Sequence, residues 1–365
     1  MSAIAVGFLS TGTIKVISMR IGHVAPLVYP VPPRTYGGTE RVIADLAKAQ
    51  VQQGHEVVLF GSSDSAVDGV SLVGGQPSLG ALGDNREEVP PGVLAELEAA
   101  QLRDLLQFGS QCDVLHLHGP AQTSAVANHL DIPIFRTIHW RADELDHAIH
   151  FQLFPNEKVI AISEKQAVDI PPSVLAGTVY HGIPLNRYAV GNGGGKYLAF
   201  LGRMTDQKRP DRAIELAQRC ALPLQLAGPI DPGNPNYFRD VVEPKLVDKI
   251  EYIGSITDLQ KQAFLGHAAA LVFPIDWPEP FGLVMIEAMA CGTPVIAWRN
   301  GSVDEVVDDG VTGVIVNSLD EAVSRLEEAL SLDRNAIRRR FEDRFGVDRM
   351  AREIVALYEK ASTIL

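Results

Sequence analysis

The sequence predicts an α/β fold of two Rossmann-like domains, in which mostly parallel sheets are covered by helices. Three observations support this prediction. Short apolar runs of strand length alternate with helical runs along most of the chain. A glycine-rich segment, 191–195, interrupts the alternation and reads as a flexible connection. The alternation then restarts, as expected for a second sheet of the same type.

The first unit opens at Met19 with a strand-like run at 20–27. The run 40–53 has apolar residues at helical spacing, with Thr39 as its expected N-cap and Gly54 ending it. The remaining strand-like runs lie at 56–61, 113–119, 132–139, 158–163, 197–202, 222–228, 250–254, 269–274, 293–298 and 312–316. Two amphipathic helices are expected at the end of the chain, at 334–346 and 347–363.

These patterns divide the chain into four parts. Residues 1–18 are expected to be a leader that is non-native or disordered, because they lack the basic start of a secretory signal. Residues 19–188 form the N-terminal domain and 189–345 the C-terminal domain, and the helix 346–365 is expected to pack back on the N-terminal domain. Ligands bind at the carboxyl ends of parallel strands, so two facing domains predict one shared cleft.

Composition excludes several classes of function. The chain has 365 residues and a net charge of −13, which argues against a nucleic-acid partner and against association with an anionic membrane. No apolar run is long enough to span a bilayer. The three cysteines are widely spaced and odd in number, which indicates reduced thiols and a cytoplasmic location.

Two glutamates stand out in the apolar stretch 276–298. Glu287 lies inside an almost wholly apolar helical run, 283–291, with no Lys or Arg within a helical turn or two. A buried carboxylate needs compensation, so Glu287 meets either a partner from elsewhere in the chain or a ligand. Glu279 precedes this helix in a rigid Pro-Glu-Pro-Phe-Gly turn.

Eight positions of helix span roughly 12 Å, which is too far for the carboxylate pair of a glycosidase. The spacing therefore favours two contacts along one elongated ligand, such as a sugar nucleotide.

Other candidate residues follow strand ends. Gly37 and Gly38 open a helix, where backbone amides can approach an anion, although a plain tight turn fits equally well. Arg203 and Lys208 follow a strand and could grip phosphate, although a solvated loop is an equal alternative. His139 ends a strand that should point into the cleft.

A lone histidine of this kind is more often structural, and four others compete with it: His55, His116, His118 and His181. The sequence has no Asp-x-Asp pair and no compact His/Cys cluster, so no protein-held metal is expected.

The sequence resembles the retaining glycosyltransferases of family 4 (GT4), which have the GT-B architecture. Glu279 and Glu287 match the E-x7-E signature of that family. Four further blocks resemble the glycine loop and first helix, the interdomain segment, the phosphate loop and the C-terminal block of the family. These blocks are 36–57, 181–188, 201–217 and 287–316, and the likeness covers nearly all of 19–345.

The resemblance implies a role for each matching residue. Glu287 would hold the ribose hydroxyls of the donor, and Glu279 the hydroxyls of its sugar, with Phe281 and Gly282 lining the same turn. These assignments make an ion pair with a distant residue the disfavoured interpretation of the two glutamates. The remaining roles are neutralisation of the diphosphate by Arg203 and Lys208, proximity to the β-phosphate and acceptor for Gly37 and Gly38, and proximity to the donor sugar for His139.

We therefore expect a retaining, metal-independent hexosyltransferase without a cofactor, whose donor is a UDP-sugar, with a GDP-sugar as the alternative. Two departures from the family, at 181–184 and at Trp140, put the hinge and the acceptor side in question. The acidic region 90–107 lacks the basic surface of membrane-associated relatives, so a soluble small molecule or carbohydrate is the expected acceptor. A GT-B epimerase or hydrolase, or a non-catalytic nucleotide-sugar binder, is the rival interpretation.

Overall fold

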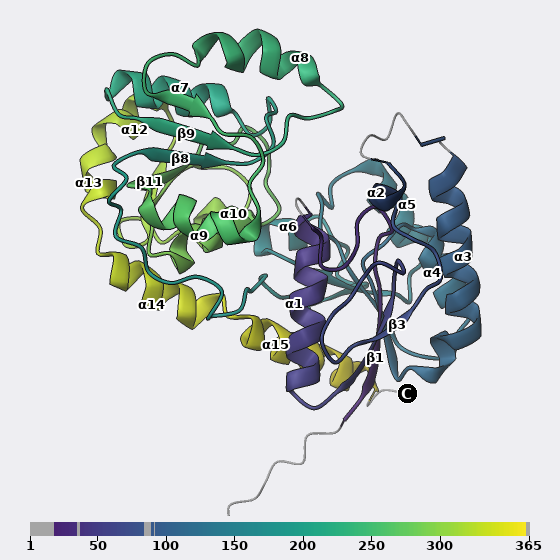
Figure 1. Cartoon of the computed structure of the whole chain (residues 1–365). Coiled ribbons are helices and arrows are strands. Elements are labelled where there is room, and N and C mark those ends of the chain that lie inside the picture. The colour runs from purple at the N-terminus through teal and green to yellow at the C-terminus, as the bar shows by residue number, and fades with distance from the viewer. Residues whose placement is uncertain (1–17, 35–36, 84–88, 91, 363–365) are drawn as a thin grey trace, which may run out of the picture.

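The computed structural model describes residues 18–34, 37–83, 89–90 and 92–362. Most of the expected leader therefore lies outside the described residues. Two lobes, each with a parallel sheet and flanking helices, make up the molecule (Figure 1). The α/β prediction with two Rossmann-like domains is thus confirmed.

The N-terminal lobe holds a parallel sheet in the order β3-β2-β1-β4-β5-β6-β7. Its strands are β1 (Arg20–Val24), β2 (Glu56–Phe60), β3 (Ser71–Val73), β4 (Val114–Leu117), β5 (Ile134–Thr137), β6 (Lys158–Ala161) and β7 (Leu175–Thr178). Five of them lie within the predicted runs. The edge strands β3 and β7 are not fully buried and carry no strong apolar pattern, which is why the sequence did not predict them.

The C-terminal lobe holds a second parallel sheet, in the order β10-β9-β8-β11-β12-β13. Its strands are β8 (Leu198–Leu201), β9 (Leu224–Ala227), β10 (Ile250–Tyr252), β11 (Ala270–Phe273), β12 (Val295–Trp298) and β13 (Gly313–Val316), and each lies within a predicted run. β11 and β12 are fully buried apolar strands, as expected where helices cover both faces of a parallel sheet. The glycine-rich segment 191–195 lies in no helix or strand between the two sheets.

Helices connect and cover the strands. Those of the N-terminal lobe are α1 (Gly38–Gln52), α2 (Leu79–Leu82), α3 (Gly92–Phe108), α4 (Gln122–Ala127), α5 (Leu145–Leu153) and α6 (Glu164–Ala167). Those that follow β8 are α7 (Pro210–Arg219), α8 (Pro235–Tyr237), α9 (Asp258–His267), α10 (Leu283–Ala290), α11 (Val303–Val306), α12 (Leu319–Ser324), α13 (Leu326–Leu330), α14 (Arg334–Arg344) and α15 (Val347–Ser362).

The prediction that Thr39 caps the first helix is wrong. α1 begins at Gly38, so Thr39 already lies inside the helix, and Gly37 occupies the N-cap position without a side-chain hydrogen bond. Glycine can adopt the backbone conformation of the turn that leads into the helix, so the turn forms without a capping hydroxyl. Gly54 does follow the helix end, with a positive φ of 93°.

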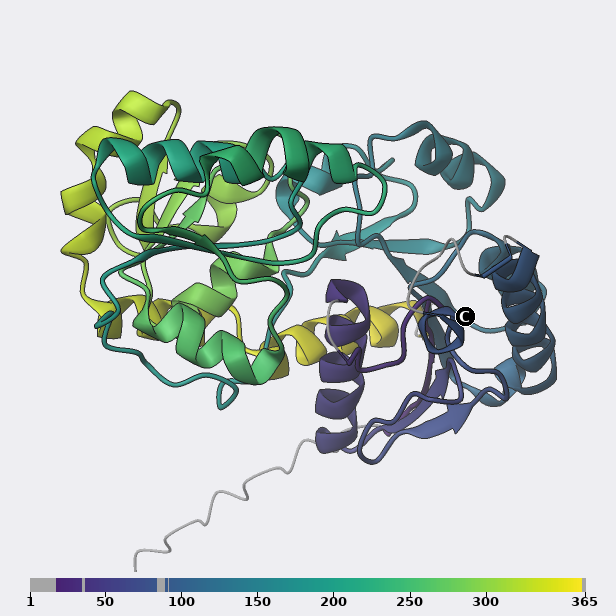
Figure 2. The same ribbon diagram turned by 45° about the horizontal axis from the view of Figure 1, so that its top comes forward.

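The last helix, α15, leaves the C-terminal lobe and runs beside α1 (Figures 1 and 2). Met350 and Ile354 of α15 share a buried cluster with Ile21 of β1 and Leu46 of α1. Tyr358, near the end of α15, is fully buried and hydrogen-bonds His116 of β4 at 2.6 Å. This helix therefore completes the core of the N-terminal lobe from its first turn, where Val347 joins the same cluster.

Candidate functional site

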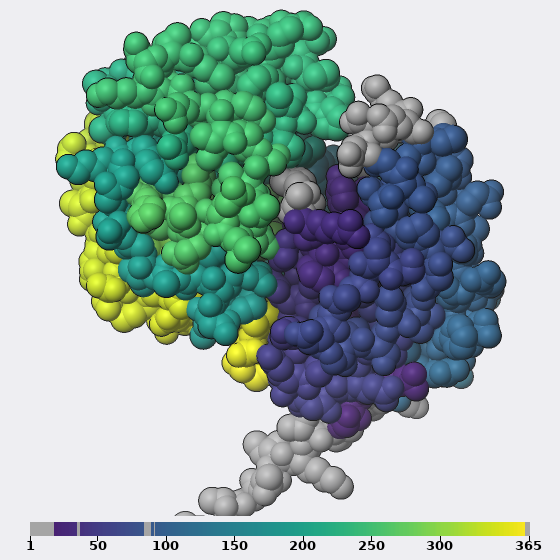
Figure 3. All heavy atoms as spheres, viewed as in Figure 1, coloured from purple at the N-terminus to yellow at the C-terminus, as the bar shows by residue number. Residues whose placement is uncertain are grey.

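The candidate site forms where the two lobes meet. Figure 3 shows the surface hollowed between them, beside the N-terminal end of α1. The C-terminal lobe contributes the turn that precedes α10. Gly282 in this turn has a φ of 82°, a value that favours glycine. A Cβ on Gly38 would lie 3.4 Å from the Leu283 side chain, so the start of α1 packs against the start of α10.

Glu279 is held in place from several sides. Its side chain forms an ion pair with Lys208, and Trp277 Nε1 donates a hydrogen bond of 2.7 Å to the same carboxylate oxygen, Oε2. The Lys208 Nζ atom also lies 4.9 Å from the centre of the Trp277 ring, within range of a cation–π contact. A Cβ on Gly301 would lie 2.2 Å from the Glu279 carbonyl oxygen, so only glycine allows this loop to pack over the turn.

Glu287 also has a counter-charge. Lys261 of α9 donates a hydrogen bond of 2.7 Å to its Oε1 atom. Burial alone would lower the pKa of Lys261, but the facing carboxylates of Glu287 and Asp258 raise it above its usual value. Asp258 in turn pairs with Arg41 of α1 at 2.6 Å, so a ladder of charges links the two lobes.

Both glutamates are thus in ion pairs with residues distant in sequence, which is the interpretation that the family resemblance disfavoured. These ion pairs do not test the ligand roles that the resemblance implies, which stay predictions. The need to compensate a buried charge predicted a partner or a ligand for Glu287, but nothing in the sequence near α10 identified Lys261 as that partner. Its position on α9 becomes informative only once the two helices are packed together.

Arg203 and Lys208 belong to the loop between β8 and α7. Lys208 reaches Glu279, whereas Arg203 has Asp231, in the loop after β9, as its counter-ion, with 3.9 Å between the nearest charged atoms. About a quarter of the Arg203 side chain is exposed (28%), so it remains accessible to an anion. The fold therefore places Lys208 at the glutamate turn and Arg203 on the same loop.

His139 follows β5 and contacts two other histidines. Its Nε2 atom lies 2.9 Å from Nδ1 of His118, and its ring stacks on His181 with 5.4 Å between centroids. The His181 ring in turn meets Phe281 edge-on at 5.1 Å, which connects His139 with the glutamate turn. Burial lowers the pKa of His139 to about 4, so its imidazole is neutral at neutral pH.

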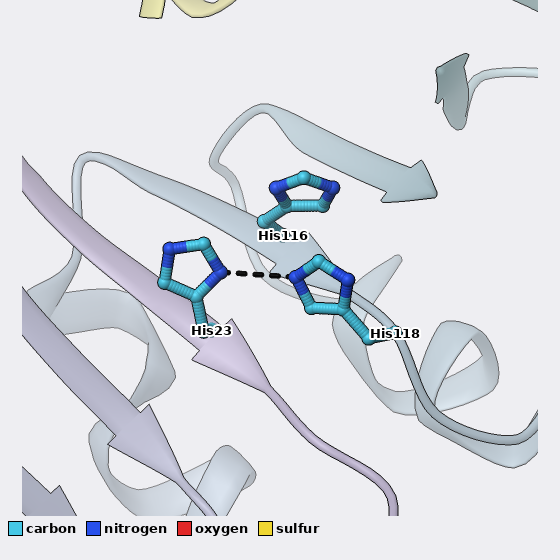
Figure 4. A group of neighbouring side chains, drawn as sticks. All are labelled: His23, His116 and His118. Atoms are coloured by element: carbon cyan, nitrogen blue, oxygen red, sulfur yellow. Dashed lines mark hydrogen bonds between the residues drawn. The ribbon is translucent and has the colours of Figure 1, made fainter. Parts of the chain in front are cut away.

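The sequence has no compact His/Cys cluster, but the fold brings three distant histidines together. His23, His116 and His118 are buried together, with one ring nitrogen from each within 4.8 Å of the others, a spacing that could hold a metal ion (Figure 4). The register of the sheet pairs His23 of β1 with His116 of β4, and His118 lies two positions further along the same face. These residues are far apart in the sequence, so their proximity could not be predicted from it.

Hydrogen bonds satisfy this cluster without a metal. Both nitrogens of His116 are engaged, one by Tyr358 and one by Thr137. Both nitrogens of His23 and of His118 are likewise engaged, by Gln50, by each other and by His139. A metal ion would have to break these bonds, so the donor set fits a hydrogen-bonded network better than a metal centre.

Family comparisons cover both lobes. The family described as "Glycosyltransferase Family 4" matches residues 36–177, and the family described as "Glycosyl transferases group 1" matches residues 187–344. No helix among the residues that the structure describes is long and apolar enough to cross a membrane.

Curated relatives match along most of their length. A phosphatidyl-myo-inositol mannosyltransferase of Mycobacterium leprae is 27% identical over 94% of this chain and 98% of its own. A second enzyme of that name, from Propionibacterium freudenreichii, is 27% identical over 81% of each chain. A D-inositol 3-phosphate glycosyltransferase of Mycolicibacterium smegmatis is 24% identical over 82% of this chain and 79% of its own.

Solved structures share the fold at lower identity. AviGT4, a glycosyltransferase involved in avilamycin A biosynthesis, superimposes with a TM-score of 0.71 at 21% identity, over 94% of this chain and 98% of its own. Anabaena HepE, solved in complex with UDP and glucose, gives 0.69 at 18% identity, over 94% of this chain and 100% of its own. With two GT-B lobes and family matches across both of them, the chain belongs to glycosyltransferase family 4.

Proposed function

We propose that this glycosyltransferase transfers a hexose from a nucleotide sugar, with UDP favoured over GDP, and retains the anomeric configuration without a metal ion. The observation that carries the proposal is the pairing of Lys208 with Glu279 at the turn before the helix that bears Glu287. It brings a cation and one carboxylate together immediately before the helix that carries the second carboxylate. The structural likeness to HepE, which was solved with UDP and glucose, supports UDP as the nucleotide.

Lys208 and Glu287 can each bind part of a donor while they keep their ion pairs. An ammonium group has three N–H donors, so Lys208 can keep its bond to Glu279 and still donate to a diphosphate oxygen. Only Oε1 of Glu287 is engaged by Lys261, which leaves Oε2 to accept from a ribose hydroxyl. In the proposal, Arg203 supplies the second positive charge at the diphosphate, and Glu279 binds hydroxyls of the sugar.

Membership of family 4 motivates the proposal of retention, and the chemistry of these groups is compatible with it. His139 is the candidate base, and the family resemblance puts it at the donor sugar rather than beside the acceptor hydroxyl. Oε2 of Glu279 already accepts from Lys208 and Trp277, which makes this carboxylate a poor nucleophile. The acceptor hydroxyl therefore attacks from the face that the diphosphate leaves, and the departing phosphate takes its proton. Arg203 and Lys208 stabilise the charge that builds on the diphosphate, and so replace a metal ion in that role.

For the acceptor, we propose a soluble small molecule or carbohydrate, and we place the reaction in the cytoplasm. The net charge of −13 opposes binding to an anionic lipid surface, and the three cysteines are free thiols. One feature favours an amphiphilic acceptor instead: Leu145, Ile149 and Leu153 form an exposed apolar stripe at helical spacing on α5. Two of the relatives named above carry phosphatidyl-myo-inositol in their names.

The test combines donor screening with product stereochemistry. UDP-, GDP- and ADP-hexoses are compared by calorimetry and then offered with inositol phosphates, simple glycosides and phosphatidylinositol vesicles in the presence of EDTA. Proton NMR of the first product from an α-linked UDP-hexose should show an α-linked sugar. A β-linked product refutes retention, a requirement for Mg²⁺ or Mn²⁺ refutes metal independence, and transfer only to vesicles refutes the soluble acceptor.

A further inference from the structure

A continuous line of hydrogen bonds runs from helix α1 through the sheet to His139. Gln50 Oε1 lies 2.7 Å from Nε2 of His23, and Nδ1 of His23 lies 3.0 Å from Nε2 of His118. Nδ1 of His118 then lies 2.9 Å from Nε2 of His139. Gln50 and His23 have no exposed surface and His118 is 7% exposed, so the line is shielded from water until it reaches His139.

The end group of this line determines where every proton lies. The Gln50 carbonyl oxygen can only accept, so Nε2 of His23 carries the proton and Nδ1 of His23 is bare. The bare Nδ1 accepts from Nε2–H of His118, whose own Nδ1 is then bare and accepts from Nε2–H of His139. Burial lowers the pKa of each of these histidines, which keeps each ring neutral with a single proton.

We propose that Gln50, His23 and His118 form a relay that positions His139 as a single tautomer, with the proton on Nε2 and a bare Nδ1. Among the residues that the structure describes, no side chain or backbone group bonds Nδ1 of His139, so this nitrogen is left for a ligand. A bare nitrogen accepts a hydrogen bond from a hydroxyl and cannot donate one to a phosphate oxygen. Nδ1 of His139 is therefore suited to a hydroxyl and not to the diphosphate. On the proposed function above, that hydroxyl belongs to the donor sugar, where the family resemblance puts His139.

His116 provides a matched control within the same cluster. Its ring lies 4.1 Å from that of His118 and is also buried, but its two nitrogens bond Thr137 and Tyr358 rather than His23, His118 or His139. The same substitution, His→Phe, at 118 and at 116 therefore removes one buried imidazole in each case, and only the first interrupts the line to His139. Gln50→Leu removes the accepting end without touching His139.

The direct test is a two-bond ¹H–¹⁵N correlation spectrum of the full chain without substrate, in which His139→Asn identifies the His139 signals. We expect a protonated Nε2 and a bare Nδ1 in the wild type and in His116→Phe, and a mixture of both tautomers in His118→Phe and Gln50→Leu. A proton on Nδ1 in the wild type overturns the proposal. An unchanged His139 tautomer in both His118→Phe and Gln50→Leu overturns it as well.

A kinetic measurement separates this proposal from the proposed function. With UDP-hexose as donor, His118→Phe should lower kcat by about 10- to 100-fold, as loss of an orienting partner typically does, while the affinity for UDP stays within about twofold. A mixed tautomer with unchanged kcat refutes the sugar contact of His139. Should neither UDP- nor GDP-hexoses be donors, the proposed function fails, and the tautomer in the substrate-free protein still decides the relay.

Discussion

Replacing Lys208 by Met tests whether its ion pair with Glu279 serves stability, catalysis or both. Removing one partner of a buried pair costs about 3–5 kcal/mol, because the remaining charge is left uncompensated. The Lys208 and Glu279 side chains are 16% and 10% exposed, and Trp277 continues to donate to the carboxylate. We therefore expect Lys208→Met to lower the free energy of unfolding by about 2–3 kcal/mol, somewhat less than for a fully buried pair.

Lys208→Met should also lower the rate of sugar transfer, and this loss should be independent of the loss of stability. Two unit charges 4 Å apart interact by about 4 kcal/mol at an effective dielectric of 20, so the loss of Lys208 beside a departing diphosphate should lower kcat by about 10²- to 10³-fold. The double variant Lys208→Met, Glu279→Gln removes both charges, so it should recover most of the stability. It should recover none of the activity, because no cation returns to the diphosphate.

Urea unfolding at constant m-value and single-turnover kinetics at saturating donor measure the two effects. Lys208→Arg keeps the positive charge and is the matched control, with an expected stability close to that of the wild type. If the double variant regains activity together with stability, the role of Lys208 is to neutralise the charge of Glu279 rather than to stabilise the diphosphate. A normal kcat in Lys208→Met would place the phosphates elsewhere.

Three further predictions concern the nucleotide, the histidines and the contact between the lobes. Glu287→Gln should weaken the affinity for free UDP by about tenfold, as expected for a hydrogen bond to a charged group, whereas Glu279→Gln should leave it within about twofold by calorimetry; equal losses in both would contradict their separate roles. Burial lowers the pKa of His23 to about 4, so the unfolded chain binds more protons than the folded one below pH 6.5. Stability should therefore be full above about pH 6.5 and fall as the pH drops toward 4, with His23 alone contributing about 3 kcal/mol, and a flat stability across this range by chemical denaturation would refute it. Glu305 of α11 accepts backbone N–H bonds of 2.6 and 2.7 Å at the start of α6 in the other lobe, so Glu305→Ala should widen the separation of the lobes, which an unchanged small-angle scattering profile would contradict.

Local pattern was sufficient for most of the fold. The strands β8, β11 and β12 are short, apolar and bounded by glycine or proline, and each lies within its predicted run because burial on both faces leaves a strong signal. The edge strands β3 and β7 bury less surface and carry no such signal. Thr39 was misread because a good capping residue two positions away competes with a glycine that can adopt the required turn.

The polar contacts of the site could not be derived in the same way. A carboxylate within an apolar run predicts that its charge must be compensated. The packing of two helices then determines which residue compensates it, as with Lys261 and Glu287. The histidine cluster depends on strand register: His23 and His116 are 93 positions apart and become neighbours only because β1 pairs with β4 in one particular alignment. Such contacts follow from tertiary structure alone.

The ladder of Arg41, Asp258, Lys261 and Glu287 gives the glycine pair at the start of α1 a defined place relative to Glu287. Arg41 lies in the first turn of α1, three residues after Gly38, and its pairing with Asp258 at 2.6 Å fixes that turn against α9. Lys261 carries the connection on to Glu287 through bonds of 3.4 and 2.7 Å. A ribose hydroxyl that donates to Oε2 of Glu287 leaves the whole ladder intact, since Lys261 uses only Oε1. The carboxylate proposed to bind the nucleotide is therefore tied to the N-terminal lobe before any donor arrives, and the backbone amides at Gly38 are held at a constant position relative to it.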